Sequence, residues 1–370
     1  MKGWILLMKK LRSVLALLMV FCMMLAAVSA FAETEAKTDQ QEDSSAVSVI
    51  EIDSVEKLAA INKNPSGNYV LTADIDLEGA EWTPLGSFVQ MGAEGEEAET
   101  PDPEYAFTGT FDGQGHTISN FTINQPDNWA LGLFGCIANT EIRDFNVDHV
   151  QVDGTTMASS VVGYSFCSTV SGIKLSNALI TAHATDMSAE GMYGGIVGAG
   201  MMSRIENCTA AADIVMPDKT ANAGIIGGGL ELTSVTGSSA AGSITAGNEC
   251  YGIGGISGCG FGAEEFTDCT AENVTINAGD NCYWIGGLTG YAGGYEEEEA
   301  GIPVTEIAGC TIQNVTIQTG GEADGIGEIV GAGFFMEGLA DAYGIEYYAN
   351  PTIFRVEDCT TENVQIDEAA

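Results

Sequence analysis

The sequence predicts an all-β fold, a parallel β-helix (solenoid) in which the chain winds into stacked coils, with a short capping helix at the N-terminal end. Two repeated patterns and the composition predict it. The chain of 370 residues contains 48 glycines but only 8 prolines, which favours short strands joined by tight turns. A tetrapeptide of the form Gly-x-x-Gly, with serine or glutamate in place of the first glycine in two copies, also recurs about every 30 residues, a period typical of solenoids. Its copies are GLFG at 132–135, SVVG at 160–163, GIVG at 195–198, GIIG at 224–227, GISG at 255–258, GLTG at 287–290 and EIVG at 328–331.

A second pattern follows each tetrapeptide and has apolar or small residues at relative positions 0, 3, 5, 8 and 10. We expect the tetrapeptide to form one strand, positions 3 and 5 a second, and positions 8 and 10 a third. About eight triangular coils would then stack into three parallel sheets. Position 7 is an asparagine in four copies and a histidine in another, and we expect these residues to form a bend. They are Asn177, Asn273, Asn314, Asn363 and His149.

The first 32 residues resemble an export signal. Lys9, Lys10 and Arg12 precede an apolar run, and small residues precede a cleavage point after Ala32. A retained N-terminal anchor is the weaker alternative. Residues 33–47 are polar and acidic and are expected to form a flexible leader. The sequence therefore predicts a secreted or cell-surface protein.

The charge is strongly acidic. The formal net charge is −40, and removing the four basic residues of the signal makes it −44. Such a surface repels phosphate groups and anionic lipids, which argues against nucleic acid or, after signal cleavage, a membrane as a partner. It is either an adaptation for solubility, the interpretation we favour, or an acidic binding surface.

Residues 48–125 are expected to form the N-terminal cap and the first coils. A strand over 47–52 precedes Asp53 and Glu56, whose spacing predicts the start of a short amphipathic helix that ends near Asn62. This helix would cover the first coil, whose interior would otherwise face water. The segments DIDL, WTPLG and FTGTFDGQGHTISNFTI follow.

These segments, together with the repeated GLFG, GIVG and GLTG of residues 126–370, resemble the GLUG-repeat proteins of bacteria. The resemblance covers nearly all of residues 48–370. It implies a right-handed parallel β-helix in an exported or surface protein. It implies little about activity, because the family includes adhesins and regions attached to surface peptidases.

Nine cysteines follow the signal. Four of them share position 3 of the second pattern, and Cys250 and Cys282 each precede a GGxxG. Neighbouring coils lie about 4.8 Å apart, so disulfides between coils are geometrically possible. The alternative, which we favour, is a ladder of buried reduced thiols. The four are Cys208, Cys269, Cys310 and Cys359.

Two insertions interrupt the repeats, near 291–306 and 332–353. Both leave the same corner of consecutive coils, so we expect them to lie side by side. Their aromatic residues are candidates for stacking on sugar rings or for contacting a protein, although they could equally cover the sheet face. The candidate ligand-binding residues are Tyr291, Tyr295, Phe334, Phe335, Tyr343, Tyr347 and Tyr348.

The sequence supports no assignment of catalytic residues, cofactor or metal. The basic residues are scattered, and neither a GxSxG nor a metal-binding spacing is present. We therefore predict a noncatalytic, adhesin-like protein that binds a glycan or a host or cell-surface protein. A carbohydrate-active enzyme, either a polysaccharide lyase or a glycosidase, is the alternative, and a structural spacer is the third possibility. The last pattern ends at Ile366, and the final coil, if uncovered, would favour self-association or mark a truncated chain.

Overall fold

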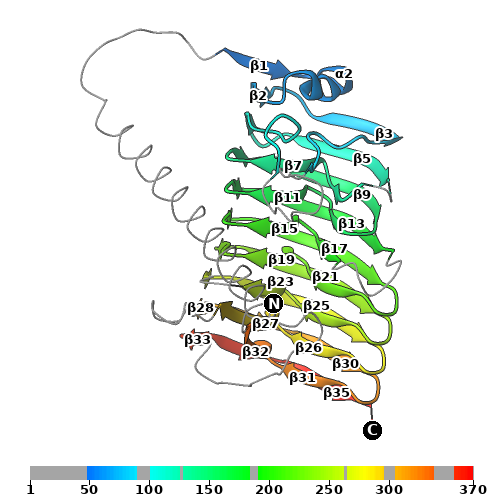
Figure 1. Cartoon of the computed structure of the whole chain (residues 1–370), viewed down its shortest axis with the longest axis vertical. Coiled ribbons are helices and arrows are strands. Elements are labelled where there is room, and N and C mark those ends of the chain that lie inside the picture. Colours follow the sequence, from blue (N-terminus) through cyan, green and yellow to red (C-terminus); the bar gives the residue numbers. More distant parts are fainter. Residues whose placement is uncertain are drawn as a thin grey trace, which may run out of the picture. The chain divides into compact units, whose positions relative to one another are not determined.

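The computed structural model describes residues 48–89, 101–125, 128–183, 191–261, 265–295, 305–336 and 354–369. The predicted signal and leader, residues 1–47, lie outside these ranges. From Val49 onward the chain forms one compact unit of stacked strands (Figure 1). All strand pairings in the described residues are parallel, and the prediction of a parallel β-helix is confirmed.

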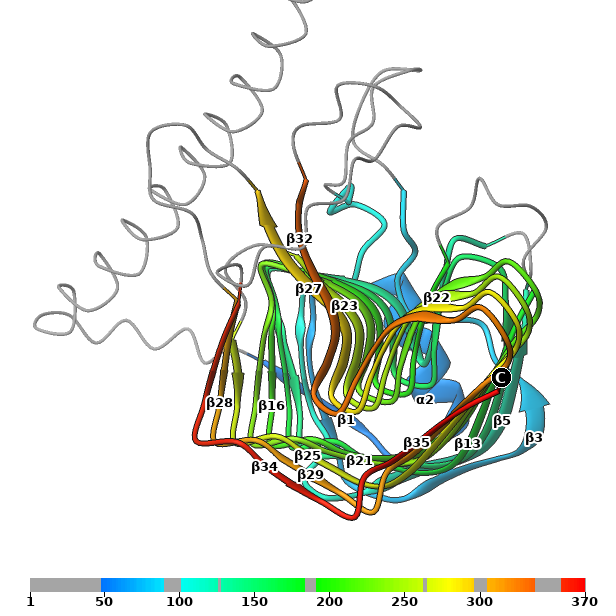
Figure 2. The ribbon, with the colours of Figure 1, turned by 90° about the horizontal axis from the view of Figure 1, so that it is seen from below.

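Each complete coil contributes strands to four sheets, not to the three that the sequence suggested. In one coil these strands are β6 (Ala130–Leu131), β7 (Phe134–Ala138), β8 (Glu141–Arg143) and β9 (Asn146–Gly154). Equivalent strands stack into four sheets, which we number 1 to 4 in this order. In Figure 2 the chain approaches the viewer as it turns counter-clockwise from β31 through β32 and β34 to β35, so the coil is right-handed.

The strand bounds follow sheet by sheet. Sheet 1 continues with β10 (Met157–Ser159), β14 (Met192–Gly194), β18 (Ala221–Gly224), β22 (Tyr251–Gly254), β26 (Tyr283–Gly286) and β31 (Asp324–Gly327). Sheet 2 continues with β11 (Val162–Phe166), β15 (Val197–Met201), β19 (Gly227–Glu231), β23 (Ser257–Phe261), β27 (Thr289–Tyr295) and β32 (Val330–Met336).

Sheets 3 and 4 begin earlier in the chain. Sheet 3 also contains β1 (Val49–Ile52), β2 (Asn68–Leu71), β4 (Thr110–Asp112), β12 (Thr169–Ser171), β16 (Arg204–Glu206), β20 (Ser234–Thr236), β24 (Glu265–Thr267), β28 (Thr305–Ala308) and β33 (Phe354–Glu357). Sheet 4 also contains β3 (Ile75–Glu81), β5 (Thr117–Asn124), β13 (Lys174–Ala182), β17 (Thr209–Met216), β21 (Ser239–Ala246), β25 (Thr270–Ala278), β29 (Thr311–Gln313), β30 (Thr316–Thr319), β34 (Thr360–Glu362) and β35 (Gln365–Glu368).

The first two residues of the Gly-x-x-Gly tetrapeptide form the corner between sheets 1 and 2, and its last two residues begin the strand of sheet 2, so the expected strand is confirmed only for the second half. This corner points into the coil, so the two sheets enclose an elbow on the outside of the molecule (Figure 2). A Cβ atom on Gly258, the last glycine of one copy, would lie 2.6 Å from the carbonyl oxygen of Gly228 in the coil before it. Glycine is therefore required because the backbones of successive coils touch here.

Strand pairing also corrects the alignment of the copies. Val197 pairs with Gly227, so the fourth copy lies at 225–228, one residue later than expected. Leu85 forms an isolated parallel β-bridge with Phe134, the third residue of the GLFG copy, so residues 83–86 are an earlier copy of the tetrapeptide. The WTPLG segment is thus the first corner of the column.

The predicted capping helix is confirmed, but its start differs. Helix α2 (Val55–Ala59) is capped by the side chain of Ser54, which accepts a hydrogen bond from the backbone N–H of Lys57, so Asp53 is not the cap. A 3₁₀ turn, η1 (Ala60–Lys63), follows. The core-facing side chains Leu58 and Ile61 are completely buried in the main apolar core. No helix in the described ranges is long and apolar enough to cross a membrane.

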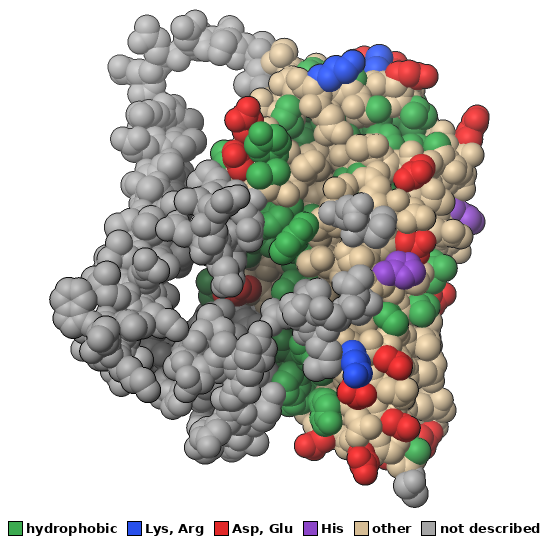
Figure 3. All heavy atoms as spheres, turned by 45° about the vertical axis from the view of Figure 1, so that its right-hand side comes forward, with side chains coloured by type: hydrophobic (Ala, Val, Ile, Leu, Met, Phe, Trp, Pro, Cys, Tyr) green, Lys and Arg blue, Asp and Glu red, His purple; other side chains and the backbone are tan. Residues whose placement is uncertain are grey.

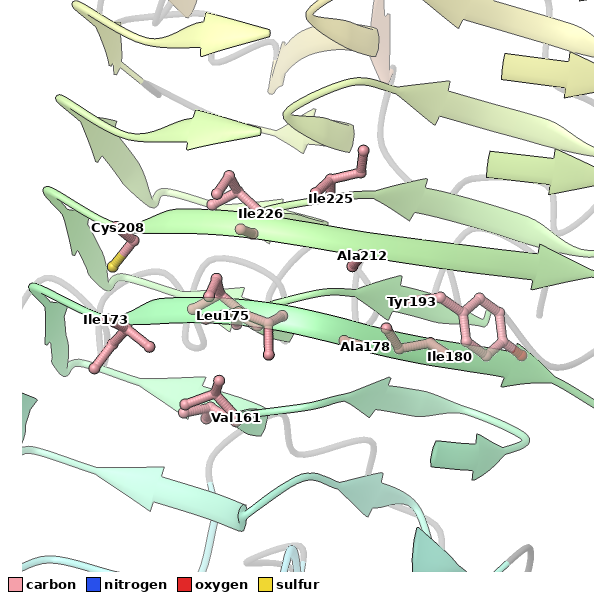
Figure 4. Close-up of a cluster of buried hydrophobic side chains, with 14 of the residues drawn as sticks. Val161, Ile173, Leu175, Ala178, Ile180, Tyr193, Cys208, Ala212, Ile225 and Ile226 are labelled. Carbon is pink, nitrogen blue, oxygen red and sulfur yellow. The ribbon is translucent and has the colours of Figure 1, made fainter. Parts of the chain in front are cut away.

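The core fills the space between the four sheets. Its N-terminal coils contain aromatic rings packed edge to face, with the ring centroid of Phe111 5.3 Å from those of both Phe134 and Phe145. Aliphatic side chains then take over, and Figure 4 shows Ile173, Leu175 and their neighbours in this middle region. The patterned apolar positions of the sequence are the ones that form this core.

Candidate ligand-binding groove on sheet 4

The long strands of sheet 4 bend at position 7 of the second pattern. Each bend residue adopts a left-handed backbone conformation, which asparagine tolerates better than most residues. The side chains also link neighbouring coils, since Asn314 donates to Asn273 (3.3 Å) and Asn363 donates to Asn314 (3.1 Å). The predicted bends are confirmed, with φ of 54° at His149, 51° at Asn177, 56° at Asn273, 51° at Asn314 and 54° at Asn363.

Two successive strands, β17 and β21, have no such bend residue. The pairing of β13 with β17 jumps from Leu175–Ala210 to Ala178–Ala212, so β17 is one residue shorter at this point. The pairing of β21 with β25 shows the reverse jump after Ala240. Between β17 and β21 the pairing is continuous. The ridge of bend residues is therefore interrupted over two coils.

A shallow groove of about 750 Å³ lies along the first part of this ridge and opens into the gap. It crosses six coils, from β3 to β21. Its lining combines side chains that form hydrogen bonds with small or apolar residues that leave the backbone accessible. The polar side chains that line it are Asp76, Glu78, Asn120, Thr122, His149, Gln151, Asn177 and Asp213.

The polar side chains at one end of the groove are held by mutual hydrogen bonds. Asp76 accepts from the side chain of Asn120 at 2.9 Å. Asp148, beside the groove, accepts from Ser176 at 2.6 Å and Asn177 at 2.8 Å, and its other oxygen lies 2.7 Å from His149 Nδ1. These bonds orient the amide and imidazole groups before any ligand arrives.

The carboxylates of this end are stabilised in their charged form. Partial burial acts to raise the pKa of Asp148, but hydrogen bonds from Ser176, Asn177 and His149 outweigh it and lower the pKa to about 2. Hydrogen bonds from Asn120 and from the backbone of Glu78 likewise lower the pKa of Asp76. At neutral pH both groups are hydrogen-bond acceptors.

The part of the groove that lies at the gap in the ridge, over β17 and β21, has a different lining. Asp213 accepts from Ser243 at 2.5 Å, and Leu179 contributes a half-buried apolar surface. The residues here are small, since Ala211 pairs with Ala241 and Gly242 pairs with Ala212 on one side and Val274 on the other. Figure 3 shows acidic side chains along the length of the molecule with histidines among them, whereas lysine and arginine are sparse. The groove can accept hydrogen bonds from hydroxyl or ammonium groups and contact an apolar ring face.

The aromatic residues selected from the sequence lie elsewhere. β27 and β32 continue as paired strands through Tyr295 and Met336, so both predicted insertions begin as strand. This pairing places Phe334 beside Gly293 and Phe335 beside Gly294. The other three candidates, Tyr343, Tyr347 and Tyr348, lie outside the described residues.

Tyr291 differs from expectation because its side chain is 5% exposed. It packs in the elbow between sheets 1 and 2, where the ring of Trp284 lies edge-on at 5.1 Å and Cys259 completes the cluster. The strand continues past Tyr291, so this residue belongs to the sheet and not to a surface loop. Its ring is not available for stacking on a ligand.

The groove was not predicted, although the sequence contains its signal. In the coils that begin at Ile205 and Val235, apolar or small residues follow at relative positions 3, 5, 7 and 9. The other copies have 3, 5, 8 and 10. The loss of one residue per coil is visible in this spacing once the copies are aligned.

The fold and the groove define a class of protein, a parallel β-helix with a polar groove across its coils. No family model matches the sequence. Over 168 residues the chain is 29% identical to halomucin of Haloquadratum walsbyi (strain DSM 16790 / HBSQ001), a match that covers 44% of this chain and 2% of halomucin.

Two solved structures are similar to the chain. A chain described as IgA1 Protease matches with a TM-score of 0.31 and 17% identity, over 90% of this chain and 21% of that one. A chain described as L. reuteri 53608 SRRP matches with a TM-score of 0.26 and 8% identity, over 86% of this chain and 99% of that one.

Proposed function

We propose that this chain is a secreted or cell-surface, noncatalytic β-helix protein of the GLUG-repeat type that binds a glycan in the groove of sheet 4. The observation that carries the proposal is the groove itself, which crosses six coils and is lined by carboxylate, amide and imidazole groups. The export signal predicted at residues 1–32 supports the location. Similarity of part of the chain to a segment of halomucin supports the same setting.

The chemistry of the lining suits sugars. Carboxylates and amides are the side chains that accept and donate hydrogen bonds to pairs of hydroxyl groups, and Leu179 offers an apolar contact for a ring face. Coils recur about every 4.8 Å, which is close to the length of one sugar unit. A linear glycan lying along the column would meet similar groups at successive coils.

The charge of the groove selects among glycans. Asp76, Glu78 and Asp213 line it, and His149 is its one basic lining residue within the described part of the chain. An acidic polymer would be repelled. We therefore propose a neutral glycan or one with amino groups as the ligand, rather than a polymer of uronic acids.

The same electrostatics supports a binding role over catalysis. A glycosidase needs one carboxyl group whose pKa is raised so that it can donate a proton. Asp76 and Asp148 have lowered pKa values and would stay ionised near neutral pH. A lyase for acidic polysaccharides would in addition need a cationic site. A carbohydrate-active enzyme thus remains the alternative that the experiment must distinguish.

The experiment is a screen of neutral, amino-containing and acidic glycans, followed by calorimetry on the best ligand. Asp213→Asn should weaken binding about tenfold, because one hydrogen bond to a charged group is worth about 1.4 kcal/mol or more. Thr316→Ala, on the same sheet outside the groove, is the matched control and should bind normally. Equal effects of both variants would contradict the groove, and shortened glycan chains or new unsaturated ends would favour the enzyme.

A further inference from the structure

Five of the nine described cysteines are stacked on neighbouring coils near the C-terminal end. Tyr283 N donates to Cys250 O, which places Cys282 directly beside Cys250 in the next coil. Thr311 N donates to Cys269 O and Thr360 N to Cys310 O, so Cys269, Cys310 and Cys359 form one column. All but Cys359 are fully buried.

The spacing of neighbouring coils is compatible with a disulfide in each pair. Equivalent residues of adjacent parallel strands lie about 4.8 Å apart, within the range of Cα separations that a disulfide spans. Within each pair the two thiols have the same orientation, because they donate to equivalent backbone carbonyls one coil apart. Cys250 donates to Pro217 O and Cys282 to Gly247 O, both at 3.2 Å. Cys269 donates to Val235 O at 3.2 Å and Cys310 to Phe266 O at 3.3 Å.

The remaining cysteines have different surroundings. Cys208 occupies the same column, but Ser238 lies in the coil between it and Cys269, and the hydroxyl of Ser238 accepts from Cys208 N. Cys136, Cys167 and Cys259 belong to the elbow clusters on the outside of sheets 1 and 2. The five C-terminal cysteines thus differ from the other four because each has another cysteine at the equivalent position of a neighbouring coil.

All nine described cysteines are free thiols in this structure, and the four of these two pairs are closed to solvent once the chain has folded. We propose that the chain, when it folds in the presence of a disulfide donor, forms two disulfides between coils, Cys250–Cys282 and Cys269–Cys310. In each case one thiolate attacks the donor disulfide and forms a mixed disulfide. The second thiolate then displaces the donor as a thiol, so two thiols are oxidised and one donor disulfide is reduced to two thiols.

Cys359 is the exchangeable member of the column. It is half-buried, and its sulfur accepts a hydrogen bond from Cys310 N at 3.4 Å. Its thiolate can attack Cys310 Sγ, forming Cys310–Cys359 and releasing Cys269 as a thiolate. The column thereby allows a disulfide to move by one coil without a change in the number of bonds.

The test is to refold the full chain in a glutathione redox buffer and in excess reductant, then alkylate all thiols in denaturant. The oxidised sample should carry four fewer alkyl groups, one for each thiol of the two pairs. Cleavage after acidic residues separates Cys269, Cys282, Cys310 and Cys359, so mass spectrometry can identify the linked peptides. Equal alkylation of both samples would overturn the proposal.

Variants separate the pairing from nonspecific oxidation. Cys282→Ser should remove the first cross-link only, and Cys208→Ser, from the same column as the second pair, should remove neither. Cys359→Ser should leave Cys269–Cys310 as the one product of that column. A cross-link that includes Cys208 would contradict the assignment.

Discussion

β13 and β17 are neighbours in sheet 4, yet one has 9 residues and the other 8. The additional residue of β13, next to Ala178, is the left-handed Asn177, whose side chain bonds Asp148 of the coil before. In β17 the chain runs straight from Ala211 to Ala212. The difference teaches that a single residue per coil decides whether the outer face carries a ridge or a recess, while the inward-facing core positions stay unchanged.

The largest effect is expected where the straight strands are most tightly packed. Gly242 has a φ of +125°, and a Cβ on it would lie 2.1 Å from the carbonyl oxygen of Ala212. Gly242→Ala should cost about 3–5 kcal/mol, since backbone strain and a clash with backbone add. Urea denaturation gives this value.

Gly115 is the matched control for that substitution. Its φ is +81°, but no neighbouring atom lies within 4 Å of the position that a Cβ would take. Gly115→Ala should therefore cost only about 1–2 kcal/mol, the strain of a left-handed backbone alone. Equal losses at the two glycines would show that the close contact between β17 and β21 is unimportant.

A smaller effect is expected for the bend residue of β13. Asn177→Ala removes both the tolerance for a φ of 51° and the bond to Asp148 and should cost about 2 kcal/mol. Asn177→Gly keeps the backbone freedom and isolates the lost hydrogen bond. If Asn177→Gly were as stable as the wild type, the ladder of side chains between bends would contribute nothing.

The smallest effect concerns pH. The folded-state pKa of Asp148 is about 2, below its ordinary value of 3.8. Its contribution to stability is therefore complete above pH 3.8 and is lost as the pH falls toward 2. Asp148→Asn should be less stable than the wild type at pH 6, and the two should converge in acid. A constant difference between pH 6 and 2 would argue against this ionised, hydrogen-bonded carboxylate.

The sequence predicts the repeated framework better than its exceptions. The apolar periodicity predicts stacked coils, and the asparagines at position 7 predict the bends. Both predictions succeed because every coil places the same kinds of residue at the same positions. The glycine tetrapeptide is compatible with a tight strand or a tight corner, and the structure divides it between the two, with the corner at its first two residues and strand at its last two. Tyr291 looked like a loop residue because strand continuation cannot be read from the length of an insertion.

The groove depends on the relation between coils, which a single repeat does not contain. The gap exists because Ala211 and Ala241 are followed directly by the next inward residue, while both flanking strands have an asparagine there. A sequence pattern that tolerates one missing residue matches the coils of β17 and β21 as well as the others, so it does not reveal the gap. The missing residue becomes informative only when each coil is aligned with its neighbours in the column.

The most direct test of the account is therefore to fill the recess. Inserting one asparagine after Ala211 and one after Ala241 gives both strands the pattern of β13 and β25. Calorimetry with the glycan found for the wild type should show binding reduced at least tenfold, with the far-UV circular dichroism of the β-helix retained. Unchanged affinity in this folded variant would contradict the claim that the two short strands create the binding site.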